Sequence, residues 1–322
     1  MIDPDDPEGQ PSSPLAMKKP GPHFPVNPSH PGDSGLADAP MPTPNLGNLL
    51  TDARHRLLDL PQAEPRLEAE LLLMSATGLS REVLLAWPER FPTPAQAHRF
   101  ANLLARRLAG EPIAHIRGRQ AFWNQELRIT PDTLIPRPET ELLVEVALEL
   151  LPAEASLVVA DAGTGSGAIA LALALERPSW TLIALEICPG AATVAADNLR
   201  RHGATNAQVV RSDWLAPLVP ASLEALIANP PYIPTGDPHL GRGDLPRESR
   251  TALAAGPDGL DAIRRLVSQA RIRLKPRGLL ALEHGFDQDL AVRDLLAVAG
   301  FMDIATRPDL SGHPRVTLGF LP

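Results

Sequence analysis

Cysteine and aromatic residues are scarce in this 322-residue chain. The one cysteine, Cys188, excludes an intramolecular disulfide and is typical of a reducing compartment. Aromatic residues make up only 4% of the sequence, so aliphatic side chains must fill most of the core. No apolar run reaches the roughly 20 residues that span a bilayer, because charged residues interrupt each one. We therefore expect a cytoplasmic protein without membrane contact.

A surplus of basic residues is also absent, since the net charge is −8. A large nucleic-acid footprint normally appears as a basic face, so we expect no direct nucleic-acid contact. The nine histidines show no metal-ligand spacing, which predicts that there is no metal site. The length allows two domains with a sizeable core, and we expect a monomer.

Composition divides the chain into four parts. Residues 1–45 hold twelve of the 36 prolines and few aliphatic clusters, which predicts a disordered tail. Residues 46–115 show apolar residues at helical spacing, broken by prolines, and predict a small helical bundle. Residues 116–135 include an alternating apolar and polar stretch at 122–129 and are expected to form a β-hairpin linker.

Residues 136–322 alternate short apolar strands with helices, which predicts an α/β domain with a doubly wound, largely parallel sheet covered on both faces. The last two strands have no helix between them and are expected to form an antiparallel hairpin at the sheet edge. Strands are expected at 157–160, 181–185, 208–211, 223–228, 279–282, 301–306 and 315–320, and helices at 168–175, 190–201, 258–274 and 288–299.

A glycine-rich turn lies between the first strand of this domain and the helix that follows. Its sequence is Asp161, Ala162, Gly163, Thr164, Gly165, Ser166 and Gly167. Such a turn lets the backbone and a helix N-terminus approach a ligand, and Glu186, after the next strand, is placed to bind ribose hydroxyls. These features suit either a nicotinamide cofactor or S-adenosylmethionine.

Two further features favour S-adenosylmethionine. The carboxylate of Asp161 suits a methionine ammonium, whereas it would repel a pyrophosphate. Asp213 can accept a hydrogen bond from the adenine amino group, and Trp214 can form an aromatic wall against the ring.

A proline-stiffened turn follows the fourth strand and consists of Asn229, Pro230, Pro231 and Tyr232. Prolines lack N–H donors, so this turn is rich in acceptors. The Asn229 side-chain oxygen and the Pro230 carbonyl can hold both hydrogens of one planar NH2 group, and Tyr232 can lie against its face. Such a grip would orient a poorly nucleophilic nitrogen for methyl transfer and stabilise the positive charge that develops on it. Asn229, Pro230 and Tyr232 are the predicted catalytic residues.

Upstream, Arg137 and Glu139 are predicted substrate-binding residues, and we expect them to form an ion pair that braces an active-site lid. Glu139 or Thr140 is expected to cap the helix that follows.

The chain resembles the glutamine methyltransferases that modify class I peptide chain release factors, from about residue 68 to the C-terminus. The likeness lies in the segments 110–118 (GEPIAHIRG), 134–141 (LIPRPETE), 163–167 (GTGSG), 229–233 (NPPYI), 256–261 (GPDGLD) and 309–312 (DLSG). It implies a class I methyltransferase fold and methylation of the glutamine amide in the factor's Gly-Gly-Gln loop. It also implies that the glycine turn, Glu186, Trp214 and Asn229 contact the cofactor, that residues 229–232 hold the acceptor, and that the helical domain docks the release factor.

The chain departs from the family pattern in three places. Glu186 stands where aspartate is usual, Ala162 replaces a bulkier residue, and residues 247–253 match the usual acidic-proline element poorly. Substrate contacts from residues 247–253 are therefore in question.

Four alternatives remain open. An enzyme that methylates the exocyclic amine of adenine or guanine uses similar turns, but the acidic charge counts against it. A ribosomal-protein glutamine methyltransferase differs in the 134–141 segment. A nicotinamide-dependent reductase leaves the 229–232 turn without a role, and a binding module leaves the whole constellation unexplained.

Overall fold

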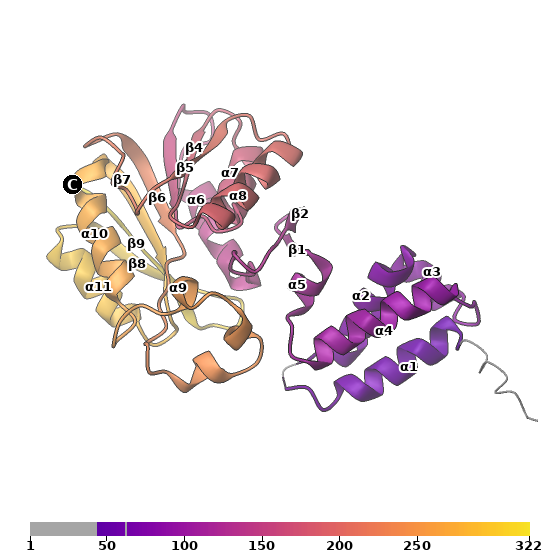
Figure 1. The fold of residues 1–322 in the computed structure, drawn as a ribbon. Coiled ribbons are helices and arrows are strands. Elements are labelled where there is room, and N and C mark those ends of the chain that lie inside the picture. The colour runs from indigo at the N-terminus through magenta and orange to yellow at the C-terminus, as the bar shows by residue number, and fades with distance from the viewer. Residues whose placement is uncertain (1–43, 62) are drawn as a thin grey trace, which may run out of the picture. The chain divides into compact units, whose positions relative to one another are not determined.

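A computed structural model of the chain describes residues 44–61 and 63–322 (Figure 1). The predicted disordered tail, residues 1–45, lies outside the described residues except for Pro44 and Asn45. Asn45 belongs to the first helix, α1 (Leu46–Leu57), because its side-chain oxygen accepts a hydrogen bond from the Asn48 N–H at 2.8 Å. This bond satisfies one of the free N–H groups of the helix terminus.

The N-terminal part is a helical bundle, as predicted. It consists of α1, α2 (Pro65–Thr77), α3 (Arg81–Ala86), α4 (Pro94–Leu108) and α5 (Ile113–Arg117). Proline occupies the first position of α2 and α4, where its missing N–H costs nothing, and Thr93 with Gln96 forms a capping box on α4. Leucines from α1, α2 and α4 form a separate core around Phe100. The bundle continues to Arg117, two residues beyond the predicted boundary.

The predicted hairpin is present as β1 (Arg119–Phe122) paired antiparallel with β2 (Gln125–Arg128). It is fixed to the sheet domain through Asn198, which is fully buried. The Asn198 side-chain oxygen accepts from the Arg128 N–H at 2.8 Å, and its NH2 group donates to the carbonyls of Arg128 and Ser166 at 3.0 and 2.8 Å. The Asn198 side chain therefore links the hairpin to the backbone of the glycine turn.

The C-terminal part contains a seven-stranded sheet in the order β5-β4-β3-β6-β7-β9-β8. Five strands are parallel, and β8 and β9 add the predicted antiparallel edge. The strands are β3 (Val158–Ala162), β4 (Thr181–Glu186), β5 (Ala207–Arg211), β6 (Leu223–Ala228), β7 (Leu274–Glu283), β8 (Met302–Pro308) and β9 (Pro314–Phe320). The sequence prediction is confirmed, and β7 begins five residues earlier than expected.

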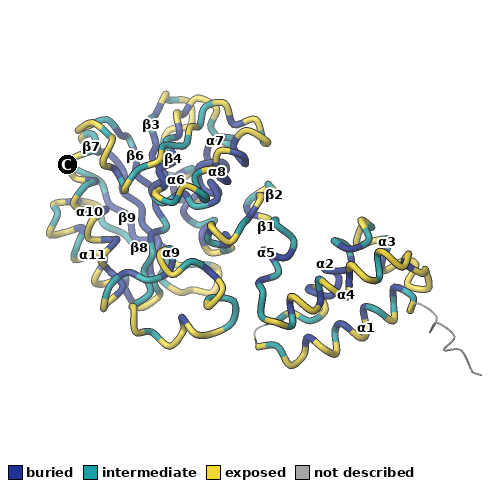
Figure 2. Tube along the Cα trace, in the orientation of Figure 1, coloured by how far each residue is buried: buried dark blue, intermediate teal, exposed yellow. Residues whose placement is uncertain are grey.

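Helices cover both faces of this sheet, and Figure 2 shows the buried strands between them. One face packs against α6 (Glu141–Leu150), α7 (Ala168–Glu176) and α8 (Pro189–Arg201), and the other against α10 (Asp261–Arg273) and α11 (Asp289–Val298). Neighbouring residues on β3 point to opposite cores, Val159 to the first and Ala160 to the second. This alternation explains why both residues are apolar.

A long connection between β6 and α10 contains elements that the sequence did not predict. They are η2 (Pro238–Gly241), η3 (Leu245–Arg247) and α9 (Arg250–Leu253). An isolated parallel bridge between Ile233 and Ala254 brings the two ends of this connection together. The connection therefore returns to the carboxyl end of β6, where the candidate site lies.

Candidate functional site

The site lies where the order of the sheet reverses. From β3 the chain proceeds to β4 and β5 on one side, whereas β6 and β7 lie on the other side. Open α/β sheets bind ligands in the crevice at the carboxyl ends of the strands at this point. The glycine turn follows β3 and the proline turn follows the adjacent β6, so the two sequence motifs meet at one edge of the sheet.

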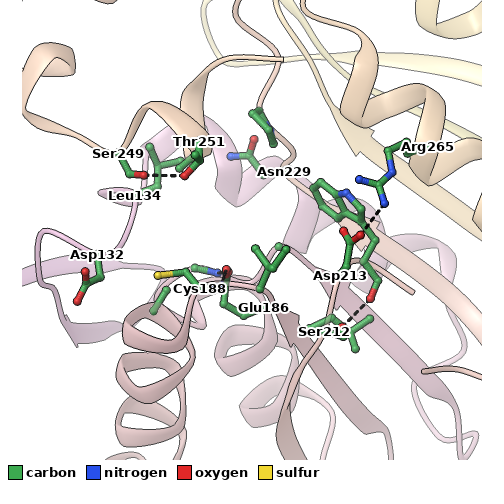
Figure 3. Close-up of a pocket in the computed structure, with 18 residues that line it drawn as sticks. Asp132, Leu134, Glu186, Cys188, Ser212, Asp213, Asn229, Ser249, Thr251 and Arg265 are labelled. Atoms are coloured by element: carbon green, nitrogen blue, oxygen red, sulfur yellow. Dashed lines mark hydrogen bonds and ion pairs between the residues drawn. The ribbon is translucent and has the colours of Figure 1, made fainter. Parts of the chain in front are cut away.

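One cavity joins the two motifs, and Figure 3 shows the residues around it. It is lined by Asp132, Leu134, Gly163, Gly165, Leu185, Glu186, Ile187, Cys188, Ala191, Ser212, Asp213, Trp214, Asn229, Pro231, Ser249, Thr251, Ala252 and Arg265. Six residues predicted to bind the cofactor are among them: Gly163, Gly165, Glu186, Asp213, Trp214 and Asn229, the last of which is also a predicted catalytic and substrate-binding residue. Pro231, predicted to bind substrate, also lines the cavity.

Glycine is required in the turn for two reasons. Gly163 has a φ of +76°, which side chains rarely adopt, and a Cβ placed there would lie 3.2 Å from the Trp214 ring. The indole therefore packs directly over the bare backbone of Gly163. This contact forms one wall of the cavity, and it supports the expected aromatic role of Trp214.

The carboxylate of Glu186 is held in place by the backbone. One oxygen accepts from the Gly165 N–H at 2.9 Å and the other from the Cys188 N–H at 2.8 Å. Each oxygen keeps acceptor capacity after these bonds, because a carboxylate has about four lone-pair sites. The longer arm of glutamate is thereby fixed at the cavity wall, where it can accept from ribose hydroxyls.

Asp161, Thr164, Ser166 and Gly167 belong to the same turn but do not line the cavity. Asp161 is buried, and its carboxylate accepts from the Thr164 hydroxyl and from the Ala170 N–H at 3.1 Å. Burial raises the pKa of Asp161 to about 7. In this structure these residues shape the turn and the start of α7, and direct cofactor contacts from them stay a prediction.

Asp213 lines the cavity but is already paired. One of its oxygens accepts from the Arg265 guanidinium at 2.8 Å, and both side chains are about half exposed. Trp214 beside it has a φ of +52°, and the Ser212 hydroxyl donates to the Trp214 carbonyl at 2.7 Å. A non-glycine residue in this conformation is strained, and such strain gathers at functional sites.

The proline turn divides its residues between the cavity and the core. Asn229 and Pro231 line the cavity, whereas Pro230 is buried. The Asn229 NH2 group donates to the Thr140 hydroxyl at 2.9 Å, so the side-chain oxygen is its free end. The Tyr232 hydroxyl donates to the Glu283 carboxylate at 3.2 Å, and burial raises the pKa of Tyr232 above its ordinary value. Tyr232 therefore stays neutral, with its hydroxyl bonded to Glu283.

The predicted ion pair between Arg137 and Glu139 is absent. Arg137 instead pairs with Glu248, whose side chain is fully buried and also accepts from the Ile135 N–H at 3.1 Å. Glu139 is exposed. The prediction was wrong because the partner lies 111 residues away, in the 247–253 segment that departs from the family pattern.

The expected helix cap was also wrong. Thr140 is the N-cap residue of α6, but neither it nor Glu139 makes a side-chain capping bond. The Thr140 hydroxyl is used by Asn229 instead.

Sequence reasoning missed the cavity residues from the connection after β6. Ser249, Thr251 and Ala252 come from α9 and the residue before it, and no periodic pattern marked them. Ile187 and Cys188 were missed as well, although their position directly after Glu186 is a signal that could have identified them.

Over residues 44–61 and 63–322, no three His, Cys, Asp or Glu side chains are grouped to hold a metal ion. Among the helices described for the same residues, none is both long and apolar enough to span a bilayer.

Two family models and several curated proteins match the chain. The model of the PrmC N-terminal domain matches residues 48–118, and that of the methyltransferase small domain matches residues 139–240. A release factor glutamine methyltransferase from Pseudomonas aeruginosa is 49% identical over 271 residues, which cover 84% of this chain and 96% of that protein. Another, from Escherichia coli, is 44% identical over 255 residues, covering 79% and 92%. A methyltransferase structure from Pyrococcus furiosus aligns over 68% of this chain and 98% of its own, with 20% identity and a TM-score of 0.47.

Proposed function

The chain belongs to the release factor glutamine methyltransferase family, and on this premise we propose how its site works. The protein transfers a methyl group from S-adenosylmethionine to the side-chain amide nitrogen of the glutamine in the Gly-Gly-Gln loop of class I release factors. The observation that carries this proposal is the meeting of the glycine turn and the proline turn on one cavity, at the ends of the adjacent strands β3 and β6.

The cofactor half of the cavity suits S-adenosylmethionine. Glu186 offers two fixed carboxylate oxygens for the ribose, and Trp214 offers an aromatic face. Asp213 and the residues of the glycine turn complete the proposed cofactor contacts. When bound, S-adenosylmethionine supplies a methyl carbon made electrophilic by its positive sulfur.

The acceptor half suits a carboxamide. An amide nitrogen is a poor nucleophile, because its lone pair is delocalised into the carbonyl. Asn229 presents its side-chain oxygen, and the Pro230 carbonyl is a second acceptor, so both N–H bonds of the glutamine amide can be held. Preorganised acceptors stabilise the positive charge that develops on nitrogen as it binds the methyl carbon. The carbon–sulfur bond would break as the carbon–nitrogen bond forms, with its electron pair left on sulfur. The methylated nitrogen is then acidic enough to release its proton to solvent, so a strong base is not needed.

The remaining parts have supporting roles. The helical domain docks the release factor, and Arg137 with Glu248 holds the 134–141 segment beside the acceptor. Glu139, which is exposed, is proposed to contact the substrate. We expect the protein to act in the cytoplasm as a monomer, without contacting nucleic acid directly.

The test is incubation of the purified protein with labelled S-adenosylmethionine and a release factor, either wild type or with the loop glutamine replaced. We expect one methyl group on the loop peptide of the wild-type factor and none on the replaced factor, as measured by peptide mass. Label on a ribosomal protein or on adenine or guanine in nucleic acid, with none on the release factor, would overturn the proposal.

A further inference from the structure

Thr140 contacts the proline turn through its side chain. It is 4% exposed, and its hydroxyl accepts the hydrogen bond from the Asn229 NH2 group at 2.9 Å. Its place at the start of α6 would let it cap the helix, yet it makes no capping bond. The hydroxyl is therefore used to hold a side chain of the acceptor site.

Glu283 is buried next to the same turn. It ends β7, which is the strand beside β6, and it is 1% exposed. Its carboxylate accepts from the Tyr232 hydroxyl at 3.2 Å. Burial raises the pKa of Glu283 to about 7, and its neighbours Thr140, Arg315 and Tyr232 lower it only in part. The other side-chain oxygen of Glu283 is buried without a hydrogen-bond partner.

The bond between Asn229 and Thr140 sets the orientation of the asparagine amide. The NH2 end of Asn229 donates, and the hydroxyl oxygen of Thr140 is the acceptor. The oxygen end of Asn229 is consequently turned the other way, as the acceptor site requires.

The opposite orientation of Asn229 would be harmful. The two ends of an asparagine amide have nearly the same shape, so packing alone does not choose between them. A flipped Asn229 would present N–H donors to the N–H donors of the glutamine amide. Both groups would then lack a partner, and the developing charge on nitrogen would be repelled instead of stabilised.

We propose that Thr140 and Glu283 are positioning residues. Thr140 orients the Asn229 amide with its oxygen toward the acceptor, and Glu283 holds the hydroxyl of Tyr232. The inference rests on the proposed function and adds two residues from outside the proline turn. Neither residue lines the cavity, so each acts through Asn229 or Tyr232 and not by touching the reacting atoms.

The experiment compares Thr140→Val and Glu283→Gln with the wild type in methyl transfer to the release factor. Valine keeps the shape of threonine without the hydroxyl, and glutamine keeps the shape of glutamate but can also donate. We expect kcat to fall about 100-fold in each, the size of effect that misplacement of a reacting group produces. The KM and binding of S-adenosylmethionine should change little, because the glycine turn and Glu186 are untouched.

Three further variants sharpen the result. Thr140→Ser retains the hydroxyl and should recover most of kcat. The double variant, Thr140→Val with Glu283→Gln, should lower kcat more than either single change, because Thr140 holds Asn229 and Glu283 holds Tyr232. Thr317→Val removes another buried hydroxyl, bonded to His284 at 2.8 Å, and should leave kcat unchanged even if it lowers Tm.

The outcomes separate the two proposals. If the wild type does not methylate the release factor, the proposed function fails. If the wild type is active and Thr140→Val, with its cofactor binding intact, keeps full kcat, the positioning inference is overturned. Loss of activity in Thr140→Ser equal to that in Thr140→Val would also overturn it. If Glu283→Gln does not fold, the comparison of Thr140→Val with Thr140→Ser tests the positioning inference.

Discussion

The two halves of the cavity are built in different ways. In the cofactor half, the glycine turn, Glu186 and Trp214 hold one another through backbone N–H groups and bare glycine surface. In the acceptor half, Asn229 and Tyr232 of the proline turn are held by the side chains of Thr140 and Glu283. A cofactor site can thus be built largely on backbone groups, whereas a weakly nucleophilic amide needs side chains that are oriented by other side chains.

The largest effect is expected for Asn229→Ala. Removing the acceptor oxygen should lower kcat by about 1,000-fold, the upper range for loss of one preorganised hydrogen bond. If the two halves work separately, S-adenosylmethionine should still bind, which calorimetric titration would measure. A large loss of cofactor affinity would show instead that Asn229 belongs mainly to the cofactor half.

Glu186→Ala tests the other half. The substitution removes the predicted hydrogen bonds to the ribose and two hydrogen bonds to the backbone. Each lost hydrogen bond to a charged group costs about 1.5–3 kcal/mol, so the affinity for S-adenosylmethionine should fall about 100-fold. At saturating cofactor, kcat should change far less than in Asn229→Ala. Glu186→Asp is the matched variant, because it keeps the charge but shortens the arm. Unchanged affinity in Glu186→Ala would remove Glu186 from the site.

Arg137→Ala should affect the acceptor half through stability. It leaves the Glu248 carboxylate buried without its ion-pair partner. Breaking a fully buried ion pair lowers the free energy of unfolding by about 3–5 kcal/mol. Because Arg137 is partly exposed, we expect a smaller loss of about 2 kcal/mol. Denaturant unfolding measures the change. Glu139→Ala is the control, and an equal loss of stability in that variant would contradict the observed pairing.

The smallest expected effect depends on pH. Each half holds one buried carboxyl with its pKa raised to about 7, Asp161 and Glu283. The unfolded chain loses these protons first, so the folded state becomes less stable as pH rises toward the raised values. Glu283→Gln removes one such group. Its stability relative to the wild type should rise by about 1 kcal/mol between pH 6 and pH 8, measured by denaturant unfolding. A difference independent of pH would show that Glu283 is not buried in its neutral form.

The sequence predicted the doubly wound sheet well, because continuous apolar strands and helical spacing are local patterns. It also predicted that the glycine turn and Glu186 would meet, since residues after neighbouring parallel strands share one edge. Local patterns could not predict the ion-pair partner of Arg137. That partner, Glu248, lies in the connection after β6, where apolar residues show no helical or strand periodicity. Local patterns failed again at Thr140, because a threonine at a helix start is the usual sign of a cap.

The most direct measurement is a crystal structure of the protein with S-adenosylhomocysteine and a Gly-Gly-Gln peptide. We expect the glutamine NH2 group to donate to the Asn229 side-chain oxygen and the Pro230 carbonyl, with its nitrogen facing the sulfur. A glutamine side chain bound elsewhere, or an Asn229 oxygen turned toward Thr140 and away from the amide, would contradict the proposed roles of both the turn and the residues behind it.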